Sequence, residues 1–321
     1  MAGAAPMLTV GIPTFERREI VCRRIADLIA AGVPERVEVL IVDDASGDGT
    51  HAALERLCAD TGVRLLRNES NLGYAGNVLR LFEECRTPYL LVAADDDAVV
   101  ADSLAPLEGL LEGSAPAFVS TGFRFGEELY RGGRGDRPIE PAELLAAGSH
   151  APGLVYRVEE CREALAAVAA RLAAGSAAAR VYPQVLILAG LLLAGRRCLW
   201  WERCAVEGET GPGAPTGIRD AAGAPYYDLG PRWEQVKDLL DFLAEEGARA
   251  GDPETAGAMA AVVEEGLFWR LRAGIEHERP DLLAAFDRSA ARFYAGRWRL
   301  DSLRARARRA AGRLRSPGRP R

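Results

Sequence analysis

The sequence is poor in lysine and contains no long uninterrupted apolar run. Lys237 is the only lysine, so almost all of the 40 basic residues are arginines. The formal net charge of −6 argues against a general nucleic-acid-binding protein. The longest apolar run, residues 185–194, is half the length of the ~20 residues that a membrane-spanning helix needs. We therefore interpret this run as a buried helix.

The six cysteines form no CxxC pair and have no spacing typical of a zinc site. Most of them lie in apolar or helical patterns, where a free cysteine behaves as a small hydrophobic residue. We therefore expect a reducing cytoplasm and no disulfide framework. The N-terminus lacks a basic segment followed by an apolar one, so we expect no secretory signal.

The first hundred residues alternate between strand and helix patterns. Apolar runs predict strands at residues 8–12, 37–42, 63–66 and 89–92. Helical spacing predicts helices between them, at residues 17–31, 51–59 and 75–85. This order predicts an α/β fold with a mostly parallel sheet and helices on both faces.

Beyond residue 100 the alternation is less regular. Further strands are predicted at residues 117–125, 154–157 and 199–202, and helices at 158–174, 184–195, 232–247, 253–274 and 280–295. Residues 126–138, rich in glycine and arginine, are predicted to be a mobile loop. We expect a main domain over residues 7–206, a flexible loop or lid over 207–230, a helical region over 231–300 and a basic tail over 301–321.

Polar side chains follow each of the first four predicted strands, at the point where the strand ends. These residues are Pro13, Thr14 and Glu16, then Asp43 and Asp44, then Asn71 and Gly73, and finally Asp95, Asp96 and Asp97. Ligands of parallel α/β sheets bind beyond the carboxyl ends of the strands. We therefore expect the four polar segments to meet at one edge of the sheet.

The three consecutive aspartates, residues 95–97, predict a metal site at that edge. Mg²⁺ and Mn²⁺ take carboxylate oxygens as ligands and keep positions open for substrate phosphates. A solvated loop, or an N-cap for a helix that begins near Asp102, is the alternative. The acidic pair Asp43 and Asp44 on the neighbouring strand favours the metal site.

Four segments resemble the inverting family 2 glycosyltransferases, which have the GT-A fold. Residues 11–17 (GIPTFER) are similar to the I-P-T-Y-N-R opening of that family, and residues 40–50 (LIVDDASGDGT) to its V-D-D-x-S-x-D-G-T segment. Residues 68–77 are similar to its N-x-G-x-x-x-x-N segment, and residues 95–97 occupy its metal motif. The resemblance covers residues 8–104, with the motifs in the family's order and spacing.

The resemblance implies a site for a nucleotide-diphospho-sugar donor. Pro13, Thr14 and Glu16 would line the nucleotide pocket. Asp44 would accept a hydrogen bond from the base, and Asn77 would lie near the ribose or the diphosphate.

The resemblance also implies a role for each aspartate of the triplet. Asp95 or Asp96 would contact the ribose or the sugar. Asp97 would bind the Mn²⁺ or Mg²⁺ that bridges the diphosphate. Such a metal acts as a Lewis acid on the departing diphosphate.

The acceptor half departs from the family pattern. An inverting transferase needs a general base, which many members carry in an E-D-x-x-L-W-x-R segment. Gln184 occupies the comparable position and cannot act as a base. Glu209 is our first candidate because lid loops commonly complete active sites, and His150, in a stretch similar to S-x-x-x-G, is the second. Glu207 and Asp228 are further candidates for the general base.

The C-terminal tail carries several arginines among alanines and leucines. It is either a solvated helix or a cationic helix that binds the anionic inner face of a membrane, where each basic residue adds about 1 kcal/mol. The second interpretation suits a cytoplasmic, peripheral enzyme that acts on a lipid-linked sugar.

We therefore expect a metal-dependent inverting glycosyltransferase of the hexosyltransferase type. It would transfer a sugar to a glycan or lipid-linked acceptor in polysaccharide biosynthesis. An inactive member that still binds nucleotide-sugar, or a sugar-nucleotidylyltransferase, is the alternative, although the G-x-G-x-R-L start of the latter is missing. No G-x-G-x-x-G follows any strand, which excludes an NAD-dependent oxidoreductase.

Overall fold

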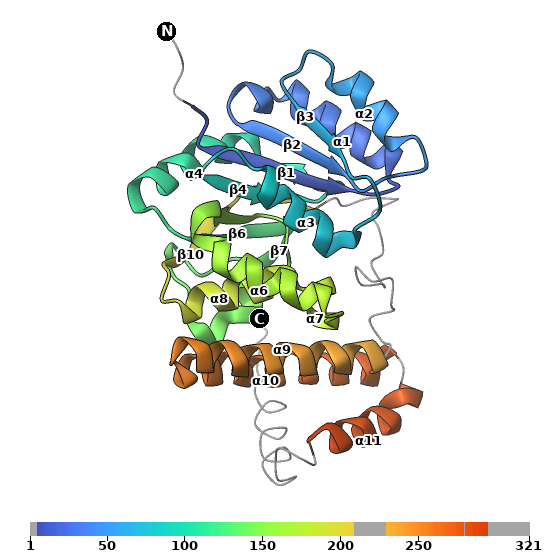
Figure 1. Cartoon of the computed structure of the whole chain (residues 1–321), viewed down its shortest axis with the longest axis vertical. Coiled ribbons are helices and arrows are strands. Elements are labelled where there is room, and N and C mark those ends of the chain that lie inside the picture. The colour runs from blue at the N-terminus through green and yellow to red at the C-terminus, as the bar shows by residue number, and fades with distance from the viewer. Residues whose placement is uncertain (1–4, 209–228, 279, 295–321) are drawn as a thin grey trace, which may run out of the picture.

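The computed structural model describes residues 5–208, 229–278 and 280–294. The strands of its main sheet are β1 (Leu8–Thr14), β2 (Glu38–Asp43), β3 (Arg64–Arg67), β4 (Tyr89–Val92), β6 (Phe118–Phe125), β7 (Glu128–Arg131), β8 (Arg137–Pro138), β9 (Leu154–Arg157) and β10 (Cys198–Cys204). Within the described residues these strands form one sheet in the order β3-β2-β1-β4-β9-β6-β10-β8, with β7 paired to β6 (Figure 1).

The sheet is mostly parallel, as predicted. Strands β1 to β4 pair in parallel, whereas β9 is antiparallel to both β4 and β6. Strand β10 is parallel to β6, and the short β8 is antiparallel to β10. The carboxyl ends of β1, β2, β3 and β4 therefore lie at the same edge, which is where the polar segments were expected to meet.

Helices cover both faces of the sheet. One face carries α1 (Arg18–Ala30), α2 (Thr50–Cys58) and α4 (Ala101–Ser114). The other carries α3 (Gly73–Glu84), α5 (Leu144–Gly148), α6 (Arg162–Ala173), α7 (Ala177–Val181) and α8 (Pro183–Leu193). In β2, Val39 and Ile41 belong to the first core, whereas Leu40 and Val42 belong to the second. A strand buried on both faces explains why its sequence is a continuous apolar run.

The C-terminal region is helical, as predicted. It consists of α9 (Leu229–Ala250), α10 (Pro253–Glu278) and α11 (Leu283–Tyr294). Helices α9 and α10 lie side by side beneath α7 and α8 (Figure 1). Phe242 and Met259 are fully buried in the same core as α8, so these two helices extend the second layer of the fold.

The prediction of a mobile loop over residues 126–138 is wrong. This segment contains β7, which returns antiparallel along β6, and β8, which pairs with β10. Gly126 and Gly132 have positive φ angles, so the glycines allow the tight turns at the two ends of β7. Arg131, at the end of β7, is buried and anchors the segment to the sheet.

A second, two-stranded sheet lies next to the aspartate triplet. Strand β5 (Ala98–Val99) follows Asp97 directly and pairs with β11 (Val206–Glu207), which follows β10. Val100 donates a backbone hydrogen bond to Ala205, which extends this contact. The chain beyond residue 204 is thereby connected to the triplet.

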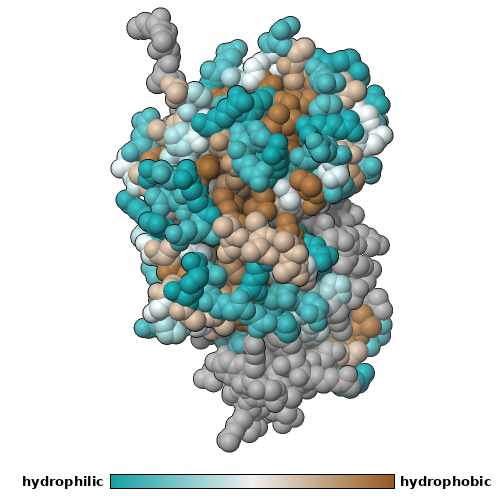
Figure 2. Space-filling model, in the orientation of Figure 1, coloured by the Kyte–Doolittle hydropathy of each residue, from teal (hydrophilic) through white to brown (hydrophobic). Residues whose placement is uncertain are grey.

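Apolar surface is limited on the face seen in Figure 1. That face is mostly hydrophilic, and its hydrophobic residues gather near the middle, between the first strands and the C-terminal helices (Figure 2). Among the described helices, none has both the length and the apolar character needed to cross a bilayer. The apolar run at residues 185–194 forms the buried helix α8, as expected.

Two glycines test the packing of the fold. A Cβ atom at Gly122, in β6, would lie 2.7 Å from the backbone oxygen of Glu202 in β10, which cannot move without disturbing the sheet. We expect Gly122→Ala to lower the free energy of unfolding by about 1–3 kcal/mol. Gly109 lies exposed in α4 with open space around it. Gly109→Ala should instead raise that free energy by about 0.5–1 kcal/mol, because alanine favours the helix.

Urea unfolding of both variants measures the two free energies. Equal effects of the two substitutions would contradict this packing of β6 against β10.

Candidate functional site

A cavity of about 530 Å³ opens at the carboxyl edge of β1, β2 and β4. Its polar lining comes from four strand-end segments, as the sequence predicted. The polar and charged lining residues are Thr14, Arg17, Asp44, Asn71, Asn77, Asp95 and Asp96. Pro13, Phe15, Tyr74, Ala151 and Pro152 complete the wall together with short backbone segments. Six of the seven predicted donor residues therefore line one cavity, and Glu16 does not.

Backbone hydrogen bonds bring the strand ends into register. Asp44 donates to the carbonyl oxygen of Thr14 at 2.9 Å, and Asn68 donates to that of Asp43 at 2.9 Å. The parallel ladder therefore continues for one residue past each strand. As a result, the side chains that follow β1, β2 and β3 lie next to one another.

Asp44 is held in a buried amide network. Its Oδ1 atom accepts hydrogen bonds from Asn68 Nδ2 and from the backbone N–H of Leu72, both at 2.8 Å. Asn68 Nδ2 also donates to Asn77 Oδ1 at 3.1 Å, and Asn77 Nδ2 donates to Val42 O at 3.0 Å. Among the described residues, these hydrogen bonds to Asp44 use only Oδ1. The network therefore fixes the Asp44 carboxylate and leaves Oδ2 for a ligand.

A second polar cluster joins the ends of β1 and β4. Thr14 Oγ1 donates to Asp95 Oδ2 at 2.8 Å. Arg17 Nη1 donates to Asp95 Oδ1 at 3.1 Å and to Asp96 Oδ2 at 2.7 Å. Two carboxylates thus share one guanidinium, and the cluster keeps a net negative charge when both are ionised.

Burial raises the pKa of Asp95 to about 6, although Arg17 and Thr14 oppose this shift. Burial lowers the pKa of Arg17, but Asp95 and Asp96 outweigh it, so the net shift is upward. The positive charge of Arg17 therefore does not fully compensate the negative charge of the two carboxylates. Arg17 is the site residue that the sequence interpretation missed, although it stands in the quoted GIPTFER segment.

Asp97 lies outside the lining of the donor cavity. Its backbone N–H donates to Ala94 O at 3.3 Å, and its side chain lines a smaller cavity of about 60 Å³ together with Asp95, Arg24 and Asp27. Its Oδ2 atom is buried and has no hydrogen-bond partner among the described residues. Burial and the neighbouring Asp96 raise the pKa of Asp97 to about 7. Asp95 therefore borders both cavities, whereas Asp96 borders the larger one and Asp97 the smaller one.

Glu16 turns away from the cavity. Its φ angle is +51°, in the left-handed region that a residue other than glycine rarely adopts. Its backbone N–H donates to Ser46 Oγ at 2.8 Å, and its side chain is exposed above Gly47. This bend places Phe15 and Arg17, on either side of Glu16, at the cavity wall.

Asp95 and Asp96 are the residues of the cavity that could hold a divalent cation. Within the described part of the chain, no three His, Cys, Asp or Glu side chains come close enough to form a metal cage. Mg²⁺ needs no such cage when one or two carboxylates and substrate phosphates bind it together. The buried, incompletely compensated carboxylate of Asp95 beside Asp96 fits that requirement.

Arg131 fixes the opposite wall of the cavity. Its guanidinium is buried and donates from Nε to Thr121 O at 2.8 Å, from Nη1 to His150 O at 2.5 Å and from Nη2 to Pro152 O at 2.6 Å. Burial lowers its pKa to about 10, so it stays charged at neutral pH. Pro152 and the preceding Ala151 line the cavity. Arg131 lies in a glycine-rich segment, and nothing in the sequence indicated this structural role.

His150 lies among aromatic rings beside the cavity. Its ring centroid is 4.3 Å from that of Phe123 and 5.1 Å from that of Tyr130. Its Nε2 atom is buried, and no hydrogen-bond partner for it lies in the part of the chain that the structure describes. Burial, and then Arg131, lower the pKa of His150 to about 3. A neutral imidazole with so low a pKa is a weak proton acceptor, which argues against His150 as the general base.

The other candidate bases do not reach the cavity or fall outside the described residues. Glu209 and Asp228 lie outside the described residues. Glu207, in β11, forms an ion pair of 3.7 Å with Arg124 and is absent from the cavity wall. Gln184 is buried in the core at the start of α8. Its amide group cannot act as a base.

Comparison with known proteins agrees with this geometry. Residues 9–155 match the family model described as Glycosyl transferase family 2. These residues are a family 2 glycosyltransferase domain. The chain is therefore a glycosyltransferase, and the resemblance of its strand-end segments to that family is confirmed. No curated protein matches its sequence.

Solved glycosyltransferases share the fold of this glycosyltransferase. TarS 1–349 of S. aureus, in complex with UDP-GlcNAc, superposes with a TM-score of 0.58 at 11% identity, over 92% of this chain and 77% of TarS 1–349. The mannosyltransferase PcManGT of Pyrobaculum calidifontis, in complex with GDP-Man and Mn²⁺, gives 0.52 at 17% identity, over 98% of this chain and 82% of PcManGT. These likenesses confirm the GT-A-type architecture.

Replacing Arg131 tests the anchoring of the cavity wall. Arg131→Met keeps an unbranched side chain but leaves three buried carbonyl groups without their donor. We expect the free energy of unfolding to fall by about 3 kcal/mol. Arg86 is exposed, and Arg86→Met should change it by less than about 0.5 kcal/mol. Urea unfolding distinguishes the two, and similar small effects would contradict the anchoring role.

Proposed function

We propose that this glycosyltransferase transfers a sugar, with inversion, from a nucleotide-diphospho-sugar to a hydroxyl group of a glycan or lipid-linked acceptor. The observation that carries the proposal is the single cavity that joins Asp44 to the pair Asp95 and Asp96. Its volume of about 530 Å³ lies in the range of about 300–1,000 Å³ that is typical of small-molecule sites. The ligands of TarS and PcManGT, UDP-GlcNAc and GDP-Man, support this class of donor.

The nucleoside would lie at the Asp44 side of the cavity. The amide network holds one carboxylate oxygen of Asp44 and leaves the other to accept an N–H group of the base. The Asn77 side chain is hydrogen-bonded to Asn68 and to the Val42 carbonyl group. It therefore orients Asp44 through Asn68. This differs from the direct contact with ribose or diphosphate that the resemblance implied.

The diphosphate would lie at the Asp95 and Asp96 side. Asp96 lines the cavity and Asp97 does not, so we assign the metal to Asp96, assisted by Asp95, in place of Asp97. Mn²⁺ or Mg²⁺ bound there would neutralise negative charge on the departing diphosphate. Arg17, now paired with both carboxylates, can pair with phosphate oxygens when a cation replaces it.

The acceptor would approach along the Ala151 and Pro152 wall. A base must remove the proton of its hydroxyl group as the bond to the sugar forms. The low pKa of His150 argues against His150, so Glu209 remains our first candidate for this role. A member that only binds its donor is the alternative, since Gln184 replaces the family's acidic residue.

We also propose that the enzyme acts in polysaccharide biosynthesis, and that it is a cytoplasmic enzyme at the inner face of the membrane. The latter rests on the arginines of residues 301–321, which lie outside the described residues.

Thermal shift with UDP, GDP, dTDP and CDP, each with and without Mn²⁺, tests the donor site. A nucleotide at a hundred times its dissociation constant adds about 2.7 kcal/mol of stability, which raises the melting temperature by several degrees. We expect at least one nucleotide to stabilise the protein more strongly with Mn²⁺. Stabilisation by none of the four would contradict the proposal.

Two matched variants locate the metal. Asp96→Asn should remove the Mn²⁺-dependent part of the shift, whereas Asp97→Asn should retain it, because Asp96 lines the donor cavity and Asp97 does not. The reverse result would show that Asp97, and not Asp96, binds the metal. Retention in both variants would contradict a metal site at the triplet.

The pH dependence of donor binding follows from the pKa of Asp95. Below about 6 this carboxyl holds a proton that a divalent cation must displace, so Mn²⁺-dependent affinity should rise with pH. We expect calorimetry with a nucleotide-sugar of the nucleotide that stabilises the protein most to show about tenfold weaker Mn²⁺-dependent binding at pH 5 than at pH 7.5. A nucleotide-sugar is suited to this test because its diphosphate does not titrate in that range. Equal affinity at both pH values would rule out Asp95 as a participant.

A further inference from the structure

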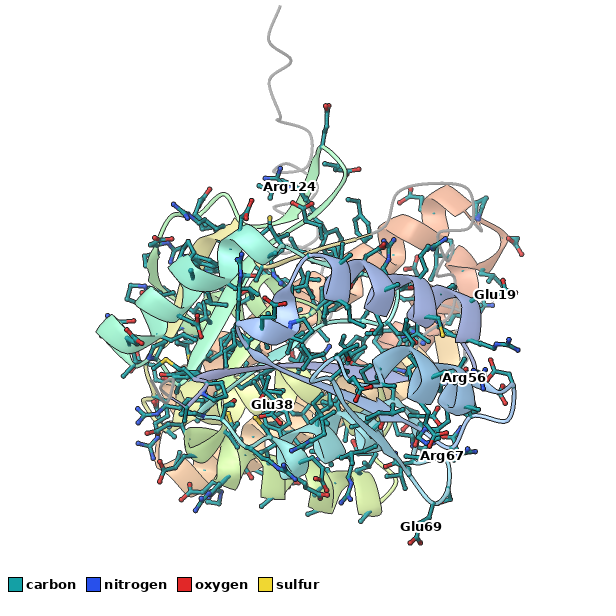
Figure 3. All side chains as sticks on the ribbon, turned by 90° about the horizontal axis from the view of Figure 1, so that it is seen from above. Glu19, Glu38, Arg56, Arg67, Glu69 and Arg124 are labelled. Carbon is teal, nitrogen blue, oxygen red and sulfur yellow. The ribbon has the colours of Figure 1, made fainter. Side chains whose placement is uncertain are left out.

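The β6–β7 hairpin presents large apolar side chains to solvent. Phe125, Leu129 and Tyr130 are 37%, 48% and 56% exposed. Only Phe15 and Leu72 among the other described residues are large hydrophobic side chains with comparable exposure. A group of exposed apolar side chains on one short element marks a binding surface more often than scattered ones do. In Figure 3, Arg124 labels this hairpin, which projects from the molecule on the side opposite Arg67 and Glu69.

The exposed rings pack against one another and against a buried ring. Phe125 and Tyr130 lie 5.8 Å apart, and Tyr130 and His150 lie 5.1 Å apart, both edge to face. Phe123 is fully buried beneath them, 5.1 Å from Phe125 and 4.3 Å from His150. Edge-to-face pairs of this kind stabilise a fixed arrangement. We call Phe125, Tyr130 and His150 the aromatic platform.

The aromatic platform is connected through the backbone to the wall of the donor cavity. Ala151 and Pro152, which line the cavity, follow His150 directly in the chain. Arg131, which follows Tyr130, binds the carbonyl groups of both His150 and Pro152. One buried guanidinium thus sets the hairpin at a fixed position relative to the cavity wall.

Polar groups border the aromatic platform. Arg124, the residue before Phe125, forms an ion pair of 3.7 Å with Glu207, and both side chains are almost half exposed. A partner that matches this surface needs an apolar face together with hydroxyl groups for hydrogen bonding. A pyranose ring has both, because its C–H bonds carry partial positive charge and are attracted to the negative face of an aromatic ring.

We propose that the aromatic platform binds a pyranose ring of the acceptor by stacking on Tyr130 and Phe125. The inference rests on the proposed transferase function. The attacking hydroxyl group must come within about 3–3.5 Å of the donor's anomeric carbon, so the acceptor must bind next to the donor cavity. The aromatic platform occupies such a place and is fixed there by Arg131.

Saturation-transfer NMR with a panel of methyl pyranosides tests the proposal in the full-length chain. The panel contains the α and β methyl glycosides of glucose, galactose, mannose, rhamnose and N-acetylglucosamine, each with the nucleoside diphosphate and Mn²⁺ that stabilise the protein most. We expect ring C–H protons of at least one glycoside to receive saturation. Tyr130→Ala should reduce that signal by about fivefold or more, because it removes the stacking face.

Two variants serve as matched controls. Tyr130→Phe keeps the ring and should keep the signal. Leu129→Ala removes an equally exposed apolar side chain that lies against Gly132 and Gly133, on the other face of β7, and should also keep it. Nucleotide affinity should stay within about twofold in all three variants, because none of these side chains lines the donor cavity.

Several results would overturn the proposal. One is the absence of any glycoside signal in protein that binds nucleotide, and another is a signal that Tyr130→Ala leaves unchanged. Loss of sedimentation with anionic vesicles in Tyr130→Ala, without a glycoside signal, would assign the hairpin to a membrane surface instead. A Tyr130-dependent glycoside signal in protein that binds no nucleotide would support the platform and contradict the donor site.

Discussion

Two adjacent carboxylates, Asp95 and Asp96, lie at the end of β4 and share the guanidinium of Arg17. Burial raises the pKa of Asp95 to about 6 in spite of this partner. The remaining negative charge suits the binding of a divalent cation together with phosphate groups. The parallel pairing of β1 with β4 brings Thr14 and Arg17 to these aspartates, so the register of the sheet itself assembles the site.

Much of this arrangement follows from the sequence because strands buried on both faces are apolar throughout and end sharply in polar residues. The ends of β1, β2 and β4 were recognisable in this way, and with them Thr14, Asp44, Asp95 and Asp96. Arg131 was not recognisable. A charged residue among glycines is usually exposed, and its burial here depends on carbonyl groups of Thr121, His150 and Pro152, which are distant in sequence.

Local geometry also decides between neighbouring residues that a motif treats as equivalent. The turn that closes between Ala94 and Asp97 directs Asp97 into a small cavity that Asp95 also borders, and away from the donor cavity. The left-handed backbone of Glu16 likewise turns its side chain out of the cavity. His150 has a histidine's chemistry, but burial and Arg131 deprive it of basicity. Backbone direction and desolvation are tertiary properties, so the order of residues alone does not specify them.

The central prediction is that a nucleoside diphosphate and its metal bind between Asp44 and Asp96. The anomalous diffraction of Mn²⁺, in crystals grown with a nucleoside diphosphate that stabilises the protein, tests it most directly. We expect one manganese peak at the side chain of Asp96, on the cavity side, with Arg17 withdrawn from that carboxylate. A manganese peak in the small cavity beside Asp97, Arg24 and Asp27, or a nucleotide bound away from Asp44, would contradict it.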